Sequence, residues 1–300
     1  MREGHGSRTA MLIARSLEYT SEDPCTGNLV SPESVDLARA AGARRTRMAR
    51  ITERWLVSGG GRPLVAAAEA VILPGIQLHY AVRKRYIEGA VEEAIRLGGR
   101  QVVVLGAGMD ALALRFARRS GDVLCIEVDH PATQAIKAEA LAGIGPVPAN
   151  LILVPADLSR QPLSEVLRAG GYDAAVPACF VAEGLTMYLD LQTVRGLLRT
   201  VAEQAPSGSR FIWTLMEPDE AGRIAFRDSR RAIVDQWLRW RGEAFTWGLT
   251  ADEVAGFVAS LGLDLLELVG SEDLRARYLT GRCTELPLAM GELICVVRKP

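Results

Sequence analysis

The sequence predicts an α/β fold in which helices cover a mainly parallel β-sheet and a helical segment precedes that sheet. From Arg100 onward, short apolar runs alternate with stretches of helical spacing. The apolar runs are hydrophobic at nearly every position, which is typical of strands buried on both faces of a parallel sheet. Before Arg100 the spacing is helical and shows no strand-like alternation.

Strands and helices are expected to alternate up to Met216. The strands are expected at residues 101–106, 122–128, 150–155, 174–182 and 209–216. The helices are expected at residues 110–119, 131–142, 161–169 and 190–204. Further helices are expected at 221–240 and 250–261, and further strands at 264–269 and 289–298. A loop of 19 residues joins these last two strands, so they are expected to pair antiparallel.

The N-terminal part is expected to consist of separate helices. They are predicted over residues 9–18, twice between 34 and 56, and over 77–97, where Gly98-Gly99 ends the last one. Residues 1–97 are therefore interpreted as a helical cap with a lead-in helix. Residues 98–300 are interpreted as the core that contains the sheet.

Size and charge limit the function classes. The 300 residues suffice for one large domain or for a core with an added cap. A formal net charge of −1 offers no basic face for nucleic acid or an anionic membrane. The histidines His5, His79 and His130 are too scattered to suggest a metal site. The expected partner is a small molecule, with neither nucleic acid nor membrane involved.

Cysteine usage and hydropathy favour a cytoplasmic location. The five cysteines include no Cys-x-x-Cys pair, and three of them lie in apolar strand-like runs, as core residues in a reducing compartment do. The longest apolar stretch, Leu64 to Ile76, contains Glu69 and Pro74 and is too short to cross a bilayer. The N-terminus shows no signal-peptide pattern.

The most informative stretch combines a glycine turn with two acids. An apolar strand leads into Gly106-Ala-Gly108, a helix follows, and the next strand ends with Glu127 and Asp129, 21 and 23 residues beyond Gly106. This is half of a nucleoside-binding βαβ unit, in which glycines allow close approach of the ligand and an acid binds the ribose hydroxyls. At most one of the two acids is expected to bind the ribose directly. Asp110 is interpreted first as a helix cap.

Two further loops follow strands at the same edge of the sheet, where open parallel sheets bind ligands. Asp157 and Leu158 follow the third expected strand and suit the amino group and ring of adenine, although Asp157 is equally compatible with a turn residue. Glu183 and Gly184 follow the fourth. Such acidic loops favour a neutral or cationic nucleoside over a pyrophosphate, which would need Lys or Arg near the glycines.

Five runs occur in a characteristic order over roughly residues 77 to 215. They are Val82-Arg83-Lys-Arg85-Tyr-Ile-Glu, Gln101-Val-Val-Val-Leu-Gly-Ala-Gly-Met-Asp110, Glu127-Val-Asp-His-Pro131, Ala156-Asp-Leu158 and Ala182-Glu-Gly-Leu-Thr-Met-Tyr-Leu189. Together they resemble the leucine carboxyl methyltransferase family, which includes bacterial O-methyltransferases of polyketide and other secondary metabolism. The resemblance implies a class I methyltransferase with a Rossmann-like sheet of five parallel strands and a C-terminal antiparallel hairpin. It implies S-adenosyl-L-methionine as cofactor, S-adenosyl-L-homocysteine as product, and a lid at about residues 217–247.

The resemblance also implies roles for single residues. The implied cofactor residues are Arg83 for the methionine carboxylate, Gly106 for the amino-acid part, Asp129 for the ribose, Asp157 and Leu158 for adenine, and Glu183 for the ammonium group. Gly108 and Glu127 are also included among the expected cofactor-binding residues. At Asp110-Ala111-Leu112 the chain departs from relatives in which Asp-Thr-Arg is common. The absent arginine weakens any polar link from that helix start.

The acceptor side is less constrained by the sequence. A carboxylate acceptor is already ionised at neutral pH, whereas a phenol gains from a general base. Tyr188, Glu183 and His79 are the candidates for such a base, and each also suits a binding or structural role. An arginine in the cap would anchor a carboxylate, and the candidates are Arg8, Arg15 and Arg223. Trp213, near the end of the fifth strand, is predicted to line a flat substrate site.

The resulting interpretation is an O-methyltransferase that acts on a carboxyl or phenolic oxygen of a small, polyketide- or peptide-like metabolite. Two alternatives stay open. An NAD(P)-dependent oxidoreductase is one, because Gly106-x-Gly108-x-x-Ala111 also satisfies a dinucleotide fingerprint. A catalytically silent cofactor-binding protein on the same scaffold is the other. Both a monomer and a homodimer are compatible with the sequence.

Overall fold

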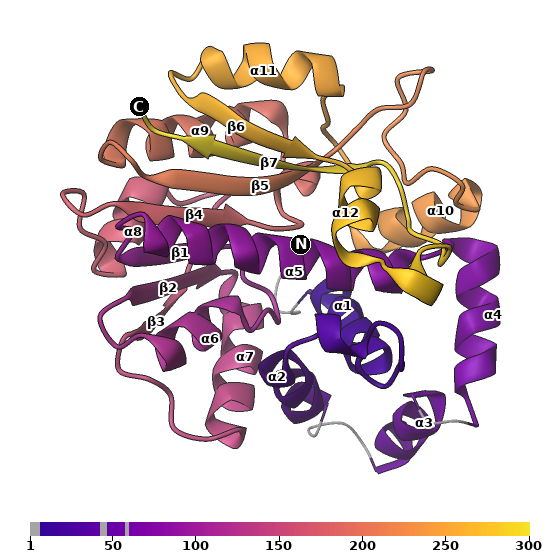
Figure 1. The fold of residues 1–300 in the computed structure, drawn as a ribbon. Coiled ribbons are helices and arrows are strands. Elements are labelled where there is room, and N and C mark those ends of the chain that lie inside the picture. Colours follow the sequence, from indigo (N-terminus) through magenta and orange to yellow (C-terminus); the bar gives the residue numbers. More distant parts are fainter. Residues whose placement is uncertain (1–6, 43–46, 58–59) are drawn as a thin grey trace.

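The computed structural model of the chain describes residues 7–42, 47–57 and 60–300. Within these residues, a seven-stranded sheet with the order β3-β2-β1-β4-β5-β7-β6 forms the centre (Figure 1). The strands are β1 Gln101–Leu105, β2 Leu124–Asp129, β3 Leu151–Pro155, β4 Ala178–Ala182, β5 Arg210–Met216, β6 Asp264–Val269 and β7 Glu292–Arg298. β1 to β5 pair in parallel, and β7 pairs antiparallel with both β5 and β6. The predicted sheet of five parallel strands and a C-terminal antiparallel pair is confirmed.

Helices precede the sheet and alternate with its strands. Before β1 lie α1 Arg8–Ser21, α2 Pro32–Gly42, α3 Arg47–Val57, α4 Arg62–Ile72 and α5 Ile76–Arg96. After β1 lie α6 Leu112–Arg119, α7 Pro131–Gly143, α8 Leu163–Ala169, α9 Leu191–Gln204, α10 Arg231–Arg241, α11 Ala251–Ala259 and α12 Ser271–Tyr278. Three short 3-10 turns are η1 Gly27–Leu29, η2 Thr186–Tyr188 and η3 Gly281–Cys283.

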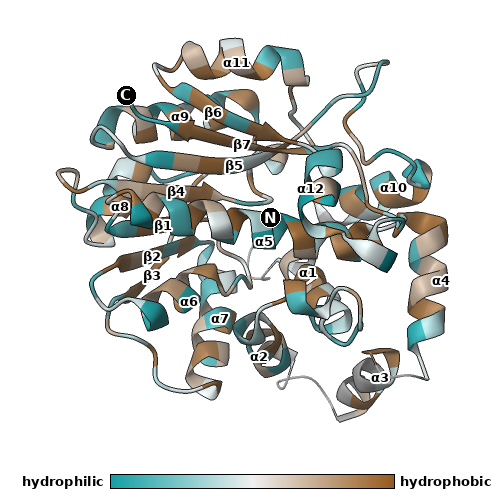
Figure 2. Cartoon of the chain, in the orientation of Figure 1, coloured by the Kyte–Doolittle hydropathy of each residue, from teal (hydrophilic) through white to brown (hydrophobic). Residues whose placement is uncertain are grey.

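The two faces of the sheet carry separate apolar cores because alternate strand residues point to opposite sides. Val102 and Val104 of β1 pack against α1, α2, α5, α6, α7 and α12. Val103 and Leu105 pack on the other face against α8, α9 and α11. The strands are therefore mainly hydrophobic, whereas the covering helices mix hydrophilic and hydrophobic residues (Figure 2). The N-terminal helices thus share one face of the sheet with α5 to α7.

Two C-terminal helices differ from the sequence prediction. The helix expected over 221–240 begins only at Arg231, because Asp219 holds a turn by accepting hydrogen bonds from the N–H groups of Ala221 and Arg223. Gly222 also takes a left-handed conformation there, with φ of 72°. The expected loop between β6 and β7 contains α12, which the pattern missed because this short, charged helix has few apolar positions.

Two further features concern the cysteines and the hydropathy of the helices. Cys25, beyond α1, forms a disulfide with Cys283 of η3, a pairing that the sequence prediction did not include. Cys125, Cys179 and Cys295 are buried free thiols, as expected for core residues. Among the described residues, no single helix is long and apolar enough to cross a bilayer; α4 and α5 taken together reach that length and composition, but the chain bends by 87° between them.

Candidate active site

The loop after β1 is enclosed on two sides. Gly106 and Gly108 both take left-handed conformations, with φ of 66° and 50°, and such conformations favour glycine. A Cβ at Gly106 would lie 2.9 Å from the Leu185 side chain, and one at Gly108 would lie 3.0 Å from the Cβ of Ala10. The glycine loop therefore sits between the loop after β4 and the first turns of α1.

Asp129, at the end of β2, faces this glycine loop. Its carboxylate accepts hydrogen bonds from the backbone N–H groups of Gly108 and of His130, the latter at 2.6 Å. Burial raises the pKa of this carboxyl, and the two N–H groups oppose the rise. The N–H of Ser7 donates to Thr133 Oγ1 at 3.1 Å, so the start of α1 covers the same corner of the sheet. Asp129 and the glycines thus form one polar recess.

Glu127 occupies a different environment from Asp129. Its carboxylate forms an ion pair with Lys137 of α7 at 2.6 Å, and both side chains are at most 1% exposed. Burial raises the pKa of Glu127, and the Lys137 ammonium opposes the rise. The inclusion of Glu127 among the cofactor residues is therefore corrected. Glu127 is one pleat further inside the sheet than Asp129, where α7 covers it and supplies its counter-charge.

A group of largely buried ionisable residues lies beside the glycine loop, and we call it the charge cluster. It consists of His79, Arg83, Lys84, Asp110, Glu183 and Glu292. Arg83 contacts two carboxylates: its Nη2 lies 2.7 Å from Glu183, and its Nη1 lies 2.7 Å from Glu292. His79 Nε2 lies 2.7 Å from the same Glu292 oxygen that Arg83 Nη1 contacts. Lys84 bridges Glu183 and Asp110, both at 3.0 Å.

The charge cluster fixes protonation states at this end of the molecule. Burial alone would raise the pKa of Glu292, but Arg83 and His79 outweigh it and hold that pKa at about 2. Burial likewise favours a neutral Asp110, but Lys84 outweighs it and lowers the pKa of Asp110. Arg83 is thus held in one orientation by ionised partners, as a residue that recognises a carboxylate needs to be.

Glu292 and Lys84 are members of the charge cluster that the sequence prediction missed. Glu292 opens the buried strand β7 and is only 1% exposed. The available signal was an acid at the start of an otherwise apolar run, since buried carboxylates need a partner. Lys84 follows Arg83 directly, and the resemblance had drawn attention to the arginine alone.

Asp157 and Leu158 follow β3 as predicted, but Asp157 is engaged in a local turn. Its carboxylate accepts hydrogen bonds from the Ser159 hydroxyl at 2.6 Å and from the Ser159 N–H at 3.0 Å. The Ser159 hydroxyl lowers the pKa of Asp157, which keeps the carboxyl ionised. Leu158 is half-buried against the core of the α8 side. The assignment of this pair to adenine stays a prediction.

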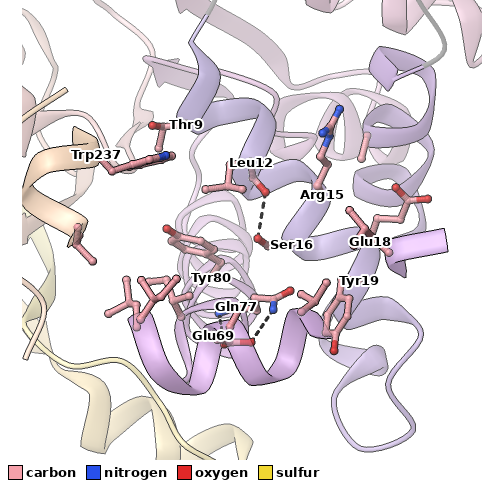
Figure 3. A pocket seen from close by; sticks show the side chains of 18 of the residues that line it. Thr9, Leu12, Arg15, Ser16, Glu18, Tyr19, Glu69, Gln77, Tyr80 and Trp237 are labelled. Atoms are coloured by element: carbon pink, nitrogen blue, oxygen red, sulfur yellow. Dashed lines mark hydrogen bonds between the residues drawn. The ribbon is translucent and has the colours of Figure 1, made fainter. Parts of the chain in front are cut away.

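A cavity of about 1050 Å³ adjoins this recess on the side of the N-terminal helices. Helices α1, α2, α3, α4 and α10 and the first turn of α5 enclose it, together with side chains from the segments around Tyr188, Phe226 and Phe245. Figure 3 shows Thr9, Trp237 and Tyr80 on one side and Arg15, Glu18 and Tyr19 on the other. Between them, Gln77 Nε2 donates to Glu69 at 2.5 Å.

The predicted acceptor-side residues divide between cavity and core. Tyr188 lines the cavity, and burial raises its pKa, so its hydroxyl stays protonated. His79 is 1% exposed and belongs to the charge cluster, which gives it a structural position. Trp213 is 1% exposed and packs 5.2 Å from Phe211 in the core on the α8, α9 and α11 side. The prediction that Trp213 lines the substrate site is wrong, because its strand position turns it to the opposite face.

The arginines predicted as carboxylate anchors are also separated. Arg15 lines the cavity. Arg223 forms a surface ion pair with Asp219 at 2.6 Å and lies outside the cavity lining. The side chain of Arg8 lies outside the described residues.

The recess fits a nucleoside that carries an amino acid. Its backbone approaches closely at Gly106 and Gly108, where a Cβ would meet neighbouring atoms. Asp129 supplies a carboxylate beside these glycines. Arg83 supplies a fixed guanidinium, and Glu183 supplies a carboxylate that accepts a hydrogen bond from Arg83. Cations suited to a pyrophosphate are not found beside the glycines among the described residues, since Lys84 is paired with Asp110 and Glu183. The donor set thus matches S-adenosyl-L-methionine.

Comparison with known proteins places the chain in a family. The sequence profile of leucine carboxyl methyltransferase matches residues 10–202. A Mycobacterium tuberculosis protein named "Putative S-adenosyl-L-methionine-dependent methyltransferase" is 36% identical over 213 residues, which cover 65% of this chain and 66% of that protein. A Streptomyces coelicolor protein of the same description is 42% identical over 158 residues, covering 52% of this chain and 55% of its own length. The chain thus spans less than two thirds of the length of these relatives.

A solved structure supports the fold independently. A DUF574 family protein from Streptomyces avermitilis aligns with a TM-score of 0.57 at 18% identity, covering 96% of this chain and 97% of its own. At this identity the likeness concerns the fold alone. Because the family profile matches more than half of the sequence, the chain belongs to the leucine carboxyl methyltransferase family.

Proposed function

We propose that the chain is an S-adenosyl-L-methionine-dependent O-methyltransferase whose acceptor binds in the cavity beneath the N-terminal helices. The observation that carries this proposal is the junction of two sites at α5. The Arg83 guanidinium carbon lies 5.2 Å from the centre of the Tyr80 ring, and Tyr80 lines the cavity. A cofactor held at Arg83 and an acceptor held in the cavity would therefore meet beside Tyr80.

The proposed roles follow from the chemistry of the side chains. When bound, S-adenosyl-L-methionine supplies a methyl group on a positively charged sulfur. Arg83 would bind its carboxylate, Asp129 its ribose hydroxyls, and Glu183 its ammonium group. Asp157 and Leu158 would contact adenine. Residues 1–97 and 217–247 would cover the acceptor and exclude water, since both segments contribute to the cavity wall.

Calorimetry with S-adenosyl-L-homocysteine tests the cofactor half. Arg83→Ala and Asp129→Ala should each weaken binding by about 1.5–3 kcal/mol, the range for losing a hydrogen bond to a charged group. Arg83→Lys provides a second variant that keeps the buried charge but loses the planar two-carboxylate contact. Matched controls are Arg223→Ala and Asp122→Ala, whose side chains are 55% and 74% exposed.

Three outcomes would count against the proposal. Unchanged affinity in both the Arg83 and Asp129 variants would show that the site is elsewhere. Saturable binding of NADH in place of S-adenosyl-L-homocysteine would favour an oxidoreductase. Cofactor binding without turnover across a broad panel of acceptors would favour the silent cofactor-binding protein.

A further inference from the structure

We infer that the methyl acceptor is a bulky, largely apolar molecule with an uncharged hydroxyl group, and that Glu243 takes the proton of that hydroxyl through Thr9. This inference rests on the proposed function and specifies the acceptor class for the same site. It chooses the hydroxyl over the carboxyl oxygen, which the sequence left open.

The size and lining of the cavity indicate a bulky apolar acceptor. Its volume of about 1050 Å³ slightly exceeds the range of about 300–1,000 Å³ that is typical of small-molecule pockets. Leu12, Ile51 and Ile233 line it and are 43%, 54% and 48% exposed. Aromatic side chains complete the wall at Trp237 and Phe245. Burying this exposed apolar surface favours an apolar ligand by about 25 cal/mol per Å².

Thr9 and Tyr80 mark the end of the cavity that faces the cofactor recess. Tyr80 packs against Arg83, and Ala10, next to Thr9, packs against Gly108. Arg15 lies on the opposite side of the cavity, where Figure 3 also shows the acid Glu18. Arg39, the other lining arginine that the structure describes, forms an ion pair with Glu18 at 3.0 Å. The reacting group of the acceptor would therefore meet Thr9 and Tyr80 rather than these arginines.

Glu243 gives this end of the cavity an acidic character. It follows α10, and its carboxylate accepts hydrogen bonds from the hydroxyls of Thr9 and Ser7, the latter at 3.2 Å. Glu243 also contributes, after burial and Tyr80, to the raised pKa of Tyr188. Arg83, which packs against Tyr80, already contacts two carboxylates. A carboxylate acceptor placed here would be repelled by Glu243, whereas a hydroxyl would not.

The hydrogen bond between Thr9 and Glu243 provides a route for the proton. Because the Thr9 hydroxyl donates to Glu243, its oxygen lone pairs are free to accept a hydrogen bond from an acceptor hydroxyl. As the acceptor oxygen bonds to the methyl carbon, the carbon–sulfur bond breaks and its electron pair goes to sulfur. The acceptor proton passes to Thr9 Oγ1, and the Thr9 proton passes to Glu243. The products are a methyl ether, a neutral thioether and a protonated Glu243.

The nearby tyrosines do not suit this task. Burial raises the pKa of Tyr80 to about 12 and also raises that of Tyr188. Both phenols therefore stay protonated at neutral pH and act as hydrogen-bond donors to the acceptor oxygen. This leaves a carboxylate, and Glu243 is the one that contacts a hydroxyl of the cavity wall at this end within the described residues.

A binding experiment tests the acceptor class without turnover. The S-adenosyl-L-homocysteine complex is titrated with 1-hydroxypyrene and with 1-pyrenecarboxylate at pH 7, and binding is followed by pyrene fluorescence. The hydroxyl compound should bind at least about tenfold more tightly, since the carboxylate must be buried beside Glu243 without a partner. Glu243→Gln should reduce that difference. Tighter binding of the carboxylate, or no binding of either compound, would overturn the inference.

A kinetic experiment tests the proton route. Formation of S-adenosyl-L-homocysteine is measured with ring-substituted naphthols whose hydroxyl groups become progressively more acidic. Glu243→Gln and Thr9→Val should lower kcat by about 100-fold for the least acidic naphthol. The loss should shrink as the hydroxyl ionises on its own. Thr9→Ser should retain activity, because serine keeps the bridging hydroxyl.

Controls separate this inference from the proposed function. Glu203→Gln changes an exposed acid of α9, outside the cavity lining, and should leave kcat unchanged. S-adenosyl-L-homocysteine affinity is measured for every variant, and a wild-type chain that fails to bind it contradicts the proposed function itself. Two results would show that the proton route is wrong while the cofactor assignment stands. One is a wild type that binds S-adenosyl-L-homocysteine normally but methylates no naphthol. The other is a Glu243→Gln variant whose kcat falls by the same factor with every naphthol.

Discussion

Two regions of opposite chemistry adjoin along helix α5. His79 and Arg83 enter the charge cluster, where every carboxylate has a cationic partner within about 3 Å. Ile76, Gln77 and Tyr80 border the cavity, whose wall is mostly apolar, and the two regions meet where Tyr80 packs against Arg83. The side chains of the charge cluster contact one another directly, whereas those of the cavity wall surround a volume of about 1050 Å³.

The difference shows how each region obtains specificity. In the charge cluster, buried ions are retained only because partners compensate for their lost hydration, so removing one partner should be costly. In the cavity, apolar side chains stay exposed and lose little if one is changed. The chain should therefore respond very differently to substitutions in the two regions. Three tests of this difference follow, from the largest expected effect to the smallest.

The largest effect is expected at Glu292. Glu292→Ala leaves Arg83 and His79 without their shared partner and should lower the free energy of unfolding by about 3–5 kcal/mol. Glu292→Gln, which keeps the shape and one acceptor, should cost less. Urea denaturation measures both variants. A loss below about 1 kcal/mol for the alanine variant would mean that the charge cluster behaves like a surface ion pair.

Acid should weaken the charge cluster in a defined pH range. The pKa of Glu292 is about 2 in the folded chain against an ordinary 4.5. The folded state therefore favours the ionised form, and this contribution to stability is present above pH 4.5 and is lost as pH falls towards 2. Glu292→Gln should flatten the stability profile in that range. An unchanged slope between wild type and variant would assign the acid sensitivity to other carboxyls.

The smallest stability effect is expected in the cavity. Ile233 is 48% exposed, so Ile233→Asn should change the free energy of unfolding by no more than about 0.5 kcal/mol. The same change should weaken 1-hydroxypyrene binding, because a polar group replaces apolar wall. Leu266→Asn on β6 is the matched control, since Leu266 is 41% exposed and lies outside the cavity lining. Equal binding by both variants would contradict the placement of the acceptor.

The sequence predicted the sheet well because its signals are local. Continuous apolar runs with glycine and acid at their ends identify buried parallel strands whether or not their neighbours are known. The glycine loop and Asp129 belong to one such segment, so their proximity follows from a single βαβ unit. The start of α10 and the existence of α12 were missed, because an aspartate turn and a short charged helix give weak periodic signals.

By itself, the sequence determined the order of strands and helices, the glycine turn and the residue types around a nucleoside. Only the tertiary structure decided which charges meet: His79 and Glu292 are 213 residues apart, and Thr9 and Glu243 are 234 apart. It also decided on which face of the sheet Trp213 lies. A strand buried on both faces is apolar on both, so its pattern does not tell which face borders a site. Electrostatic and packing contacts depend on distance through space, and one-dimensional spacing encodes that distance only within a single supersecondary unit.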